Sequence, residues 1–236
     1  NIMLNTMVAE ELSQFYDELK DAEDMEIAVK ALIKKTFTEH QAIIFNGNNY
    51  TEAWKKEAER RGLLNLETTV DALPHFSKAE NIALFSKYNI FSKTEIVSRS
   101  EIMYDNYCMT MRIEANTELE MIRRDILPSA EAYAELLSRS AMSKKALGLD
   151  FMRDSGFETL KKILENTNAL CESADRLEAL LHESDGLCSS IKRAEMIRDS
   201  IIPEMENARR FADNLEVLVA RSYWPFPTYG DLLFGV

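Results

Sequence analysis

Apolar residues recur along most of this chain at the three- and four-residue spacing of amphipathic helices, and the alternation typical of strands is almost absent. Only seven glycines and five prolines interrupt the 236 residues. The pattern predicts an all-α protein. We expect a long antiparallel bundle of kinked helices, with a smaller helical segment before it and an irregular apolar tail after it.

The first part of the chain predicts short helices with defined ends. One helix is expected over about 6–19 and another from Asp24, whose carboxylate can cap it, to about 43. Their apolar stripes are Val8, Leu12, Phe15 and Leu19 on the first helix, and Ile27, Leu32, Ile33 and Phe37 on the second. A turn-rich loop at 44–50 leads to a third helix, which Thr51 opens and Gly62 ends in the left-handed conformation.

Residues 63–74 predict an extended connector. The run Thr68-Thr69-Val70 disfavours helix, and the residue before Pro74 avoids the α region. A domain boundary is therefore expected near residue 72. Two capping boxes follow, Ser77 with Glu80 and Ser92 with Glu95, and each predicts a helix start.

A single long helix is predicted from about 93 to 147, where Gly148 can end it. At 1.5 Å per residue it would be roughly 80 Å long, with a bend at Pro128. Its apolar row has an eleven-residue repeat, at Met111, Ala115, Leu119, Ile122, Ile126, Ala130, Tyr133, Leu137 and Ala141.

Two more long helices are predicted by their apolar rows. The first has a heptad seam with one polar insertion, at Leu160, Ile163, Thr167, Leu170, Ala174, Leu177 and Leu181. The second has its row at Ile201, Met205, Ala208, Ala212, Leu215 and Val219. Pro203 would kink this helix opposite the bend at Pro128 if the two helices run antiparallel. Together the three long helices predict a bundle over 73–222.

The last fourteen residues, 223–236, are unusually apolar for the end of an acidic chain. A terminus with this much aromatic area is not expected to stay in water. We therefore predict a docking tail, on this chain or on another. Its candidate interface residues are Tyr223, Trp224, Phe226, Tyr229, Leu232, Leu233 and Phe234.

Charge and composition exclude several classes of partner. The formal charge of −12 and the pI near 4.9 oppose binding to phosphate backbones and anionic lipid. We therefore expect no nucleic-acid partner and no membrane partner. Three cysteines without a zinc-site spacing favour reduced thiols and a cytoplasmic location. The first residue is not methionine, and the sequence is interpreted as a piece of a larger soluble protein.

Candidate catalytic chemistry is sparse. His40, His75 and His182 are far apart, and no Glu-x-x-His unit, Walker loop or nucleophile elbow is present. Glu178 and His182 share a helix face, as a solvated pair or, less simply, as part of a metal site. The turn at 46–49 is either an ordinary turn or an anion cradle. The carboxylates Glu114, Glu118 and Glu120 are typical of a solvated helix face.

Five blocks of sequence, spread over the whole chain, resemble the carboxyl-terminal part of type III glutamine synthetases. They are LNTMVAEEL at 4–12, IIFNGN at 43–48, EAERRGL at 57–63, TTVDALP at 68–74 and WPFPTYGDLLF at 224–234. The resemblance implies a parent enzyme that ligates ammonia to glutamate with ATP and Mg or Mn. It also implies that the active site lies upstream of this chain, so that no catalytic, cofactor-binding or metal-binding residue is carried over.

The resemblance further implies that residues 1–72 are the closing helices of the catalytic domain. Three functions stay open. The chain could be a non-catalytic helical module that supports the fold and the subunit contacts of a large ring-shaped homo-oligomer. It could be a regulatory docking surface for a protein or a metabolite. It could also be an independent enzyme that holds a metal between carboxylates of the bundle.

Overall fold

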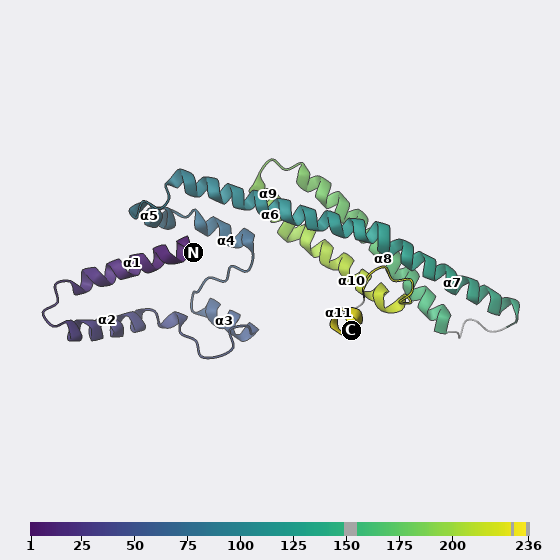
Figure 1. The fold of residues 1–236 in the computed structure, drawn as a ribbon, viewed down its shortest axis with the longest axis horizontal. Coiled ribbons are helices and arrows are strands. Elements are labelled where there is room, and N and C mark those ends of the chain that lie inside the picture. The colour runs from purple at the N-terminus through teal and green to yellow at the C-terminus, as the bar shows by residue number, and fades with distance from the viewer. Residues whose placement is uncertain (149–154, 228, 235–236) are drawn as a thin grey trace. The chain divides into compact units, whose positions relative to one another are not determined.

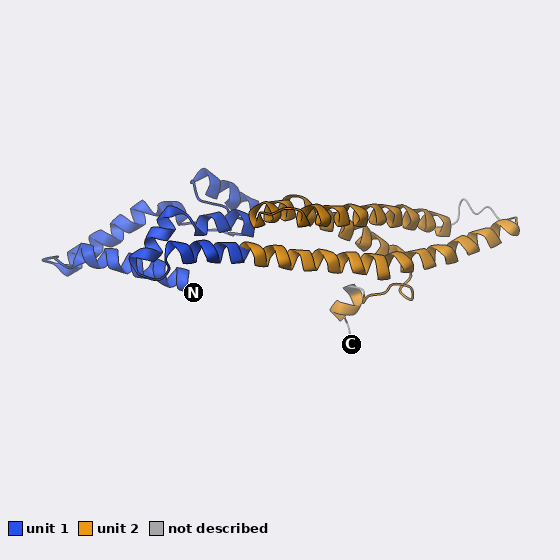
Figure 2. Ribbon diagram, turned by 90° about the horizontal axis from the view of Figure 1, so that it is seen from above, with its two compact units in different colours: residues 1–103 blue, residues 104–236 orange. Residues whose placement is uncertain are grey.

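A computed structural model describes residues 1–148, 155–227 and 229–234, without the side chain of Tyr229, and the regular structure of these residues is helical (Figure 1). The predicted all-α fold is confirmed. The chain divides into two compact units, residues 1–103 and 104–236 (Figure 2). The expected division into 1–72, 73–222 and 223–236 rests on roles in a larger protein and stays a prediction.

Unit 1 begins with α1 (Ile2–Leu19), α2 (Met25–Glu39), a 3₁₀ turn (Gln41–Ile43) and α3 (Glu52–Arg60). The capping prediction for Asp24 is confirmed, because its carboxylate accepts hydrogen bonds from the backbone N–H groups of Glu26 and Ile27. Gly62 follows α3 with φ of 72°, a conformation that favours glycine. The start of α2 and the end of α3 therefore lie where the local sequence predicts them.

The connector predicted over 63–74 is wrong, because α4 (Thr69–Phe76) begins inside it. Thr68 caps this helix by accepting a hydrogen bond from the backbone N–H of Asp71, and it donates one to the Asp71 carboxylate. Val70 and Leu73 are buried. Capping and burial together outweigh the weak helix propensity of the threonines and the missing N–H of Pro74.

The next helix, α5 (Ala79–Lys87), does not use the predicted Ser77 capping box. Ser77 instead ends α4, so its hydroxyl is not available to the start of α5. The second box is formed, because the Glu95 side chain accepts from the backbone N–H of Ser92 at 2.8 Å, at the start of α6 (Lys93–Met121). The core of unit 1 lies around these elements and contains Val70, Leu73, Phe85 and Ile96.

Unit 2 is a three-helix bundle. The second part of α6 continues through a π-helical turn (Ile122–Ile126) into α7 (Leu127–Ala146). The chain returns along α8 (Ser155–Asp185), and α9 (Ser190–Met196), a second π-helical turn (Ile197–Ile201) and α10 (Ile202–Leu218) form the third rod. Gly148 ends α7 with φ of 75°, as predicted. A short helix, α11 (Tyr229–Phe234), lies in the tail that was expected to be irregular.

The direction of each rod follows from contacts between side chains. Arg112 and Arg123 of the first rod pair with Asp185 and Glu178 of α8, so these helices are antiparallel. α10 also runs antiparallel to α8, since Ser173 contacts Glu204 while Asn166 contacts Asn214. The first and third rods are therefore parallel to each other. The prediction that Pro203 kinks its helix opposite the bend at Pro128 required antiparallel helices, and this requirement is not met.

The two π-helical turns share a sequence motif, EMIRRDILP at 120–128 and EMIRDSIIP at 195–203. In each, the residue before proline donates its N–H to the carbonyl five positions earlier, Leu127 to Ile122 and Ile202 to Ile197. A proline cannot donate to the residue four positions back and its ring collides with that carbonyl. One widened turn avoids the collision, so both prolines sit at the first turn of a new α-helix.

The apolar rows predicted for the bundle form its core. All seven predicted seam residues of α8, from Leu160 to Leu181, are buried. The row on the first rod is buried from Ala115 to Ala130, and Ile201, Ala208, Leu215 and Val219 are buried on the third. Because α8 packs against both α7 and α10, its seam supplies the centre of the bundle.

Candidate functional site

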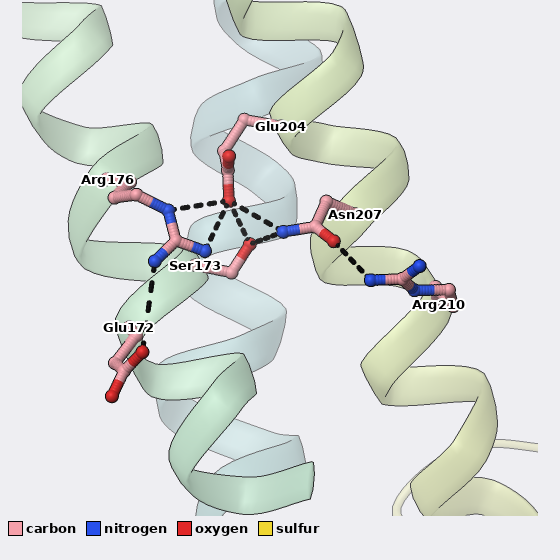
Figure 3. A network of polar contacts seen from close by, with 6 residues as sticks. All are labelled: Glu172, Ser173, Arg176, Glu204, Asn207 and Arg210. Carbon is pink, nitrogen blue, oxygen red and sulfur yellow. Dashed lines mark hydrogen bonds and ion pairs between the residues drawn. The ribbon is translucent and has the colours of Figure 1, made fainter.

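A polar network lies inside the bundle between α8 and α10 (Figure 3). Ser173, which is fully buried, donates its hydroxyl hydrogen bond to the carboxylate of Glu204. The same carboxylate accepts from Asn207 at 3.1 Å and from the guanidinium of Arg176 at 3.1 Å. Burial raises the pKa of Glu204, but the donated hydrogen bonds outweigh burial, and the net pKa is lowered. The network therefore holds an ionised carboxylate in a partly buried position between the two helices.

These hydrogen bonds can form only when α8 and α10 have one particular axial position relative to each other. Shifting α10 by one turn would leave the partly buried Glu204 charge without these donors, which is costly. Its chemistry is satisfied by the chain itself, and its groups are already engaged with one another. We therefore assign it a role in helix register and look for a binding surface elsewhere.

A groove of about 770 Å³ runs between α6 and α10. Its base contains Ile122 and Ile126 of the first π-helical turn, and its walls carry three methionines, Met111, Met121 and Met205. Trp224, Phe226 and Leu232 of the tail line it as well. This surface is apolar and adaptable, because methionine side chains can repack around different partners.

The rim of the groove is acidic. Five carboxylates line it, against the single cation Arg209: Glu114, Glu118, Glu206, Asp213 and Glu216. Arg209 is paired with Asp213 at 3.6 Å. The groove therefore joins an apolar base to a negative border, a combination that selects for partners with an apolar face and positive charges.

Glu118 differs from the solvated helix face that its sequence predicts. It is only partly exposed, and burial raises the pKa of its carboxyl to about 7, although Arg209 acts in the opposite direction. Glu114 is exposed, and Glu120 forms an ion pair with Arg124, so these two fit the prediction. The local sequence gives no signal for the Glu118 environment, because the burial comes from the groove.

The predicted docking residues of the tail have different surroundings. Tyr223 packs on Tyr133 of α7 with the ring centroids 5.3 Å apart. Trp224 and Phe226 are partly buried in the groove, while Leu232, Leu233 and Phe234 are 70%, 73% and 78% exposed. The side chain of Tyr229 lies outside the described residues. The start of the tail thus contacts the bundle, and the side chains of Leu232, Leu233 and Phe234 in α11 are largely exposed.

A smaller cavity of about 270 Å³ lies at the other end of the bundle. It is lined by Asp105, Cys108, Arg112, Asp185 and Arg193, among others. Arg112 pairs with Asp185 at 2.8 Å, and Asp105 accepts a hydrogen bond from Ser190. Burial raises the pKa of the Cys108 thiol, which disfavours the reactive thiolate. Most charges around this cavity are therefore satisfied by neighbours.

The remaining candidate residues have structural surroundings. Glu178 binds Arg123 through both carboxylate oxygens at 2.8 Å, and this cation, more than His182, lowers its pKa. In the turn at 46–49, a Cβ atom on Gly47 would lie 2.8 Å from the Phe45 ring, so glycine lets that ring pack on the turn. The side chain of Asn48 accepts from the N–H of Tyr50. This geometry favours the ordinary turn over the anion cradle.

The helices α1 and α2 of unit 1 leave a large apolar surface open. Every residue of α2 is described and none is buried, while α1 buries only Thr6. We call the exposed residues the α1–α2 apolar surface: Leu4, Met7, Val8, Leu12, Ile27, Ile33 and Phe37, which are 51–67% exposed. The surface includes two of the four stripe residues predicted for the first helix and three of the four predicted for the second. A surface of this extent is typical of an interaction site.

Residues 28–145 match the family model described as the glutamine synthetase C-terminal domain. The match spans half of the chain. The chain belongs to this glutamine synthetase family. The family resemblance predicted from the five sequence blocks is confirmed.

Curated glutamine synthetases are similar over almost the whole chain. The chain is 33% identical over 93% of its length to a glutamine synthetase from Butyrivibrio fibrisolvens, and 32% identical over 99% to a type-3 glutamine synthetase from Dictyostelium discoideum. A glutamine synthetase from Bacteroides fragilis is 26% identical over 99%. The chain spans about a third of the length of these relatives.

Within the parts of this chain that the structure describes, no three His, Cys, Asp or Glu side chains converge in a way that could hold a metal ion. In the same residues, no helix is both long and apolar enough to cross a membrane. The docking role of the tail residues stays a prediction, and sequence reasoning missed the groove. The signal for it was present in the row of α10, where Met205 and Ala212 continue the apolar stripe beyond what α8 covers.

Proposed function

We propose that this chain is the C-terminal helical, non-catalytic module of a glutamine synthetase. The parent enzyme would ligate ammonia to glutamate with ATP and Mg or Mn, and this module would support its fold and the contacts between its identical subunits. The observation that carries the proposal is the α1–α2 apolar surface, which no other described part of unit 1 buries. The chain's alignment to one third of each relative supports the same division.

The physical reason is the free energy of burial. An apolar side chain of this size gains about 1.5–3 kcal/mol when it leaves water, so a set of this extent strongly favours a covering partner. We assign that partner to the rest of the enzyme, with the ATP and metal sites outside this chain.

The proposal is tested in the complete enzyme with two double variants of equal added charge. Leu12→Asp with Ile33→Asp alters the α1–α2 apolar surface, whereas Asn5→Asp with Thr38→Asp alters exposed polar positions of the same helices. We expect the first pair to lose assembled mass in light scattering together with glutamine synthesis, and the second to keep both. Normal assembly and activity of the first pair would overturn the proposal.

A second test uses the 236-residue chain alone. We expect no γ-glutamyl transfer and no ATP hydrolysis with Mg or Mn, because under the proposed function these reactions take place in the two thirds of the enzyme that this chain does not span. Clear turnover would contradict the non-catalytic role. Deleting residues 75–222 from the complete enzyme separates support from regulation: lost assembly favours the support role, and intact assembly with lost feedback favours a regulatory surface.

A further inference from the structure

The groove between α6 and α10 contains no residue of the polar network or of the α1–α2 apolar surface, and it combines three features that suit a binding site. Its base is apolar, its walls contain Met111, Met121 and Met205, and its rim is acidic. Ile113 and Met121 are 58% and 38% exposed, so apolar area faces solvent there. We propose that this groove binds a basic amphipathic helix of a partner protein.

The dimensions favour a helix. The lining residues of α10 run from Ile202 to Glu216, which is roughly 21 Å of helix or about four turns. A partner helix of similar length would present anchors at positions i, i+3, i+4 and i+7 to the apolar base. Methionine walls let such anchors differ in shape, because the flexible thioether side chains can repack.

The charges select the sign of the partner. Glu114, Glu206, Asp213 and Glu216 create a negative border around the apolar base, while Glu118, with a pKa of about 7, is only partly ionised at neutral pH. Lysine or arginine side chains flanking the anchors would meet this border. A second copy of this chain is a poor occupant of this groove, because its net charge of −12 opposes the negative rim, and the subunit contacts of the proposed function are assigned to the α1–α2 apolar surface instead. The described residues of the tail do not fill the groove, since Trp224 and Phe226 form part of its lining and Leu232 keeps 70% of its surface exposed.

Glu118 would take a particular part in binding. A partner cation near its carboxyl would favour the ionised form, which burial disfavours in the free protein. On the α10 side it faces Arg209, and Glu206 and Asp213 lie in the same lining; on its own helix Glu114 is one turn away. These groups are the ones that a bound lysine or arginine would meet first.

The probe for the experiment is a synthetic 18-residue peptide of leucine and lysine with leucines at helical spacing, carrying a fluorescent label. Two control peptides are used, one with glutamate in place of lysine and one with the same composition in scrambled order. Binding to the 236-residue chain is measured by fluorescence anisotropy at a fixed salt concentration. We expect only the amphipathic basic peptide to bind.

Location is tested with matched charge reversals. Glu114→Lys with Glu206→Lys reverses two exposed rim charges, and Glu131→Lys with Glu158→Lys reverses two exposed charges outside the groove lining, so both variants have the same net charge. We expect the rim variant to bind the peptide about tenfold more weakly and the control to bind nearly as the unaltered chain does. Equal weakening in both variants would overturn the proposal, since it would indicate general attraction.

Methionine methyl resonances locate the peptide directly. With ¹³C-methyl labels, Met111, Met121 and Met205 report on the groove, Met142 reports on an exposed site of α7, and Met7 and Met25 report on the exposed apolar residues of unit 1. Shifts confined to the groove methionines support the proposal. Shifts confined to Met7 and Met25, or concentration-dependent dimerisation that the peptide does not reverse, would contradict it.

Discussion

The bundle of unit 2 and the helical pair α1–α2 of unit 1 are both built from amphipathic helices, but they differ in what covers their apolar residues. In the bundle, α8 packs against α7 and α10, and its seam residues Ile163, Leu170 and Leu177 are fully buried. In α1 and α2, residues of the same kind, such as Leu12 and Ile33, keep 60% and 51% of their surface exposed.

The difference teaches that an apolar stripe predicts a helix but does not identify its partner. In the bundle, the chain covers its own apolar residues, because α7 and α10 both pack against the seam of α8. The α1–α2 apolar surface needs a partner from outside unit 1, and under the proposed function this partner is the remainder of the enzyme. Substitutions in the two regions should therefore have different effects on the isolated chain.

The largest expected effect is in the seam of the bundle. Leu177→Ala should lower the free energy of unfolding by about 2–5 kcal/mol, because it leaves a cavity at a fully buried position. Leu12→Ala in α1 is the matched control and should change it by less than about 0.5 kcal/mol. A Trp54→Phe background keeps Trp224 as the single tryptophan, in unit 2, and a Trp224→Phe background keeps Trp54, in unit 1, so that urea unfolding of each unit can be followed separately. Equal losses of unfolding free energy from Leu177→Ala and Leu12→Ala would show that the two regions do not differ in how their apolar residues are covered.

The next effect is in the polar network of α8 and α10. Glu204→Ala should cost about 1.5–3 kcal/mol, because Ser173 and Asn207 lose their common acceptor in the core. Glu206→Ala, at an exposed position two residues further along, should have little effect on the free energy of unfolding. A result near zero for both variants would contradict the register role of the network.

Removing residues 223–236 should lower the stability of the bundle by about 1–2 kcal/mol, which is the burial of three partly buried aromatic rings less the entropy of ordering the tail. Thermal unfolding and light scattering measure the effect. Tyr223→Ala alone should reproduce part of it, because that ring packs on Tyr133. Unchanged unfolding together with unchanged mass would refute a docked tail.

The smallest effect is in the pH dependence of the groove carboxyl. The folded pKa of Glu118, about 7, lies above its ordinary value of 4.5, so the folded state binds more protons between these values. The free energy of unfolding should therefore fall as pH rises from 4.5 to 7, by about 1 kcal/mol after allowance for solvent screening. The difference between the curves of Glu118→Gln and the unaltered chain isolates this contribution.

Glu204 provides the opposite sign within the same bundle. Its folded pKa is lowered, so its stabilising contribution is present above the ordinary pKa of glutamate and is lost as pH falls through the folded value. A Glu114→Gln control, at an exposed position of α6, should leave the curve of the unaltered chain nearly unchanged. If Glu118→Gln also leaves the pH dependence of unfolding unchanged, the carboxyl of Glu118 is not buried enough to raise its pKa.

Most of the helical architecture was predictable from the sequence because it depends on local patterns. The heptad seam of α8 identified its buried face, Asp24 and Glu95 identified helix starts, and Gly62 and Gly148 identified helix ends. The shared motif before Pro128 and Pro203 was also readable, although a widened turn does not follow from proline alone. Where local signals competed, as at Thr68 and Ser77, propensity gave the wrong element.

The sequence by itself determined the all-α class, the buried rows and the family, because each is recorded in the order of residues along one helix or one block. Only the tertiary structure decided the parallel course of the first and third rods, the donors around Glu204, the burial of Glu118 and the surfaces left open. These properties depend on residues that are distant in sequence and meet only when α6, α8 and α10 pack together.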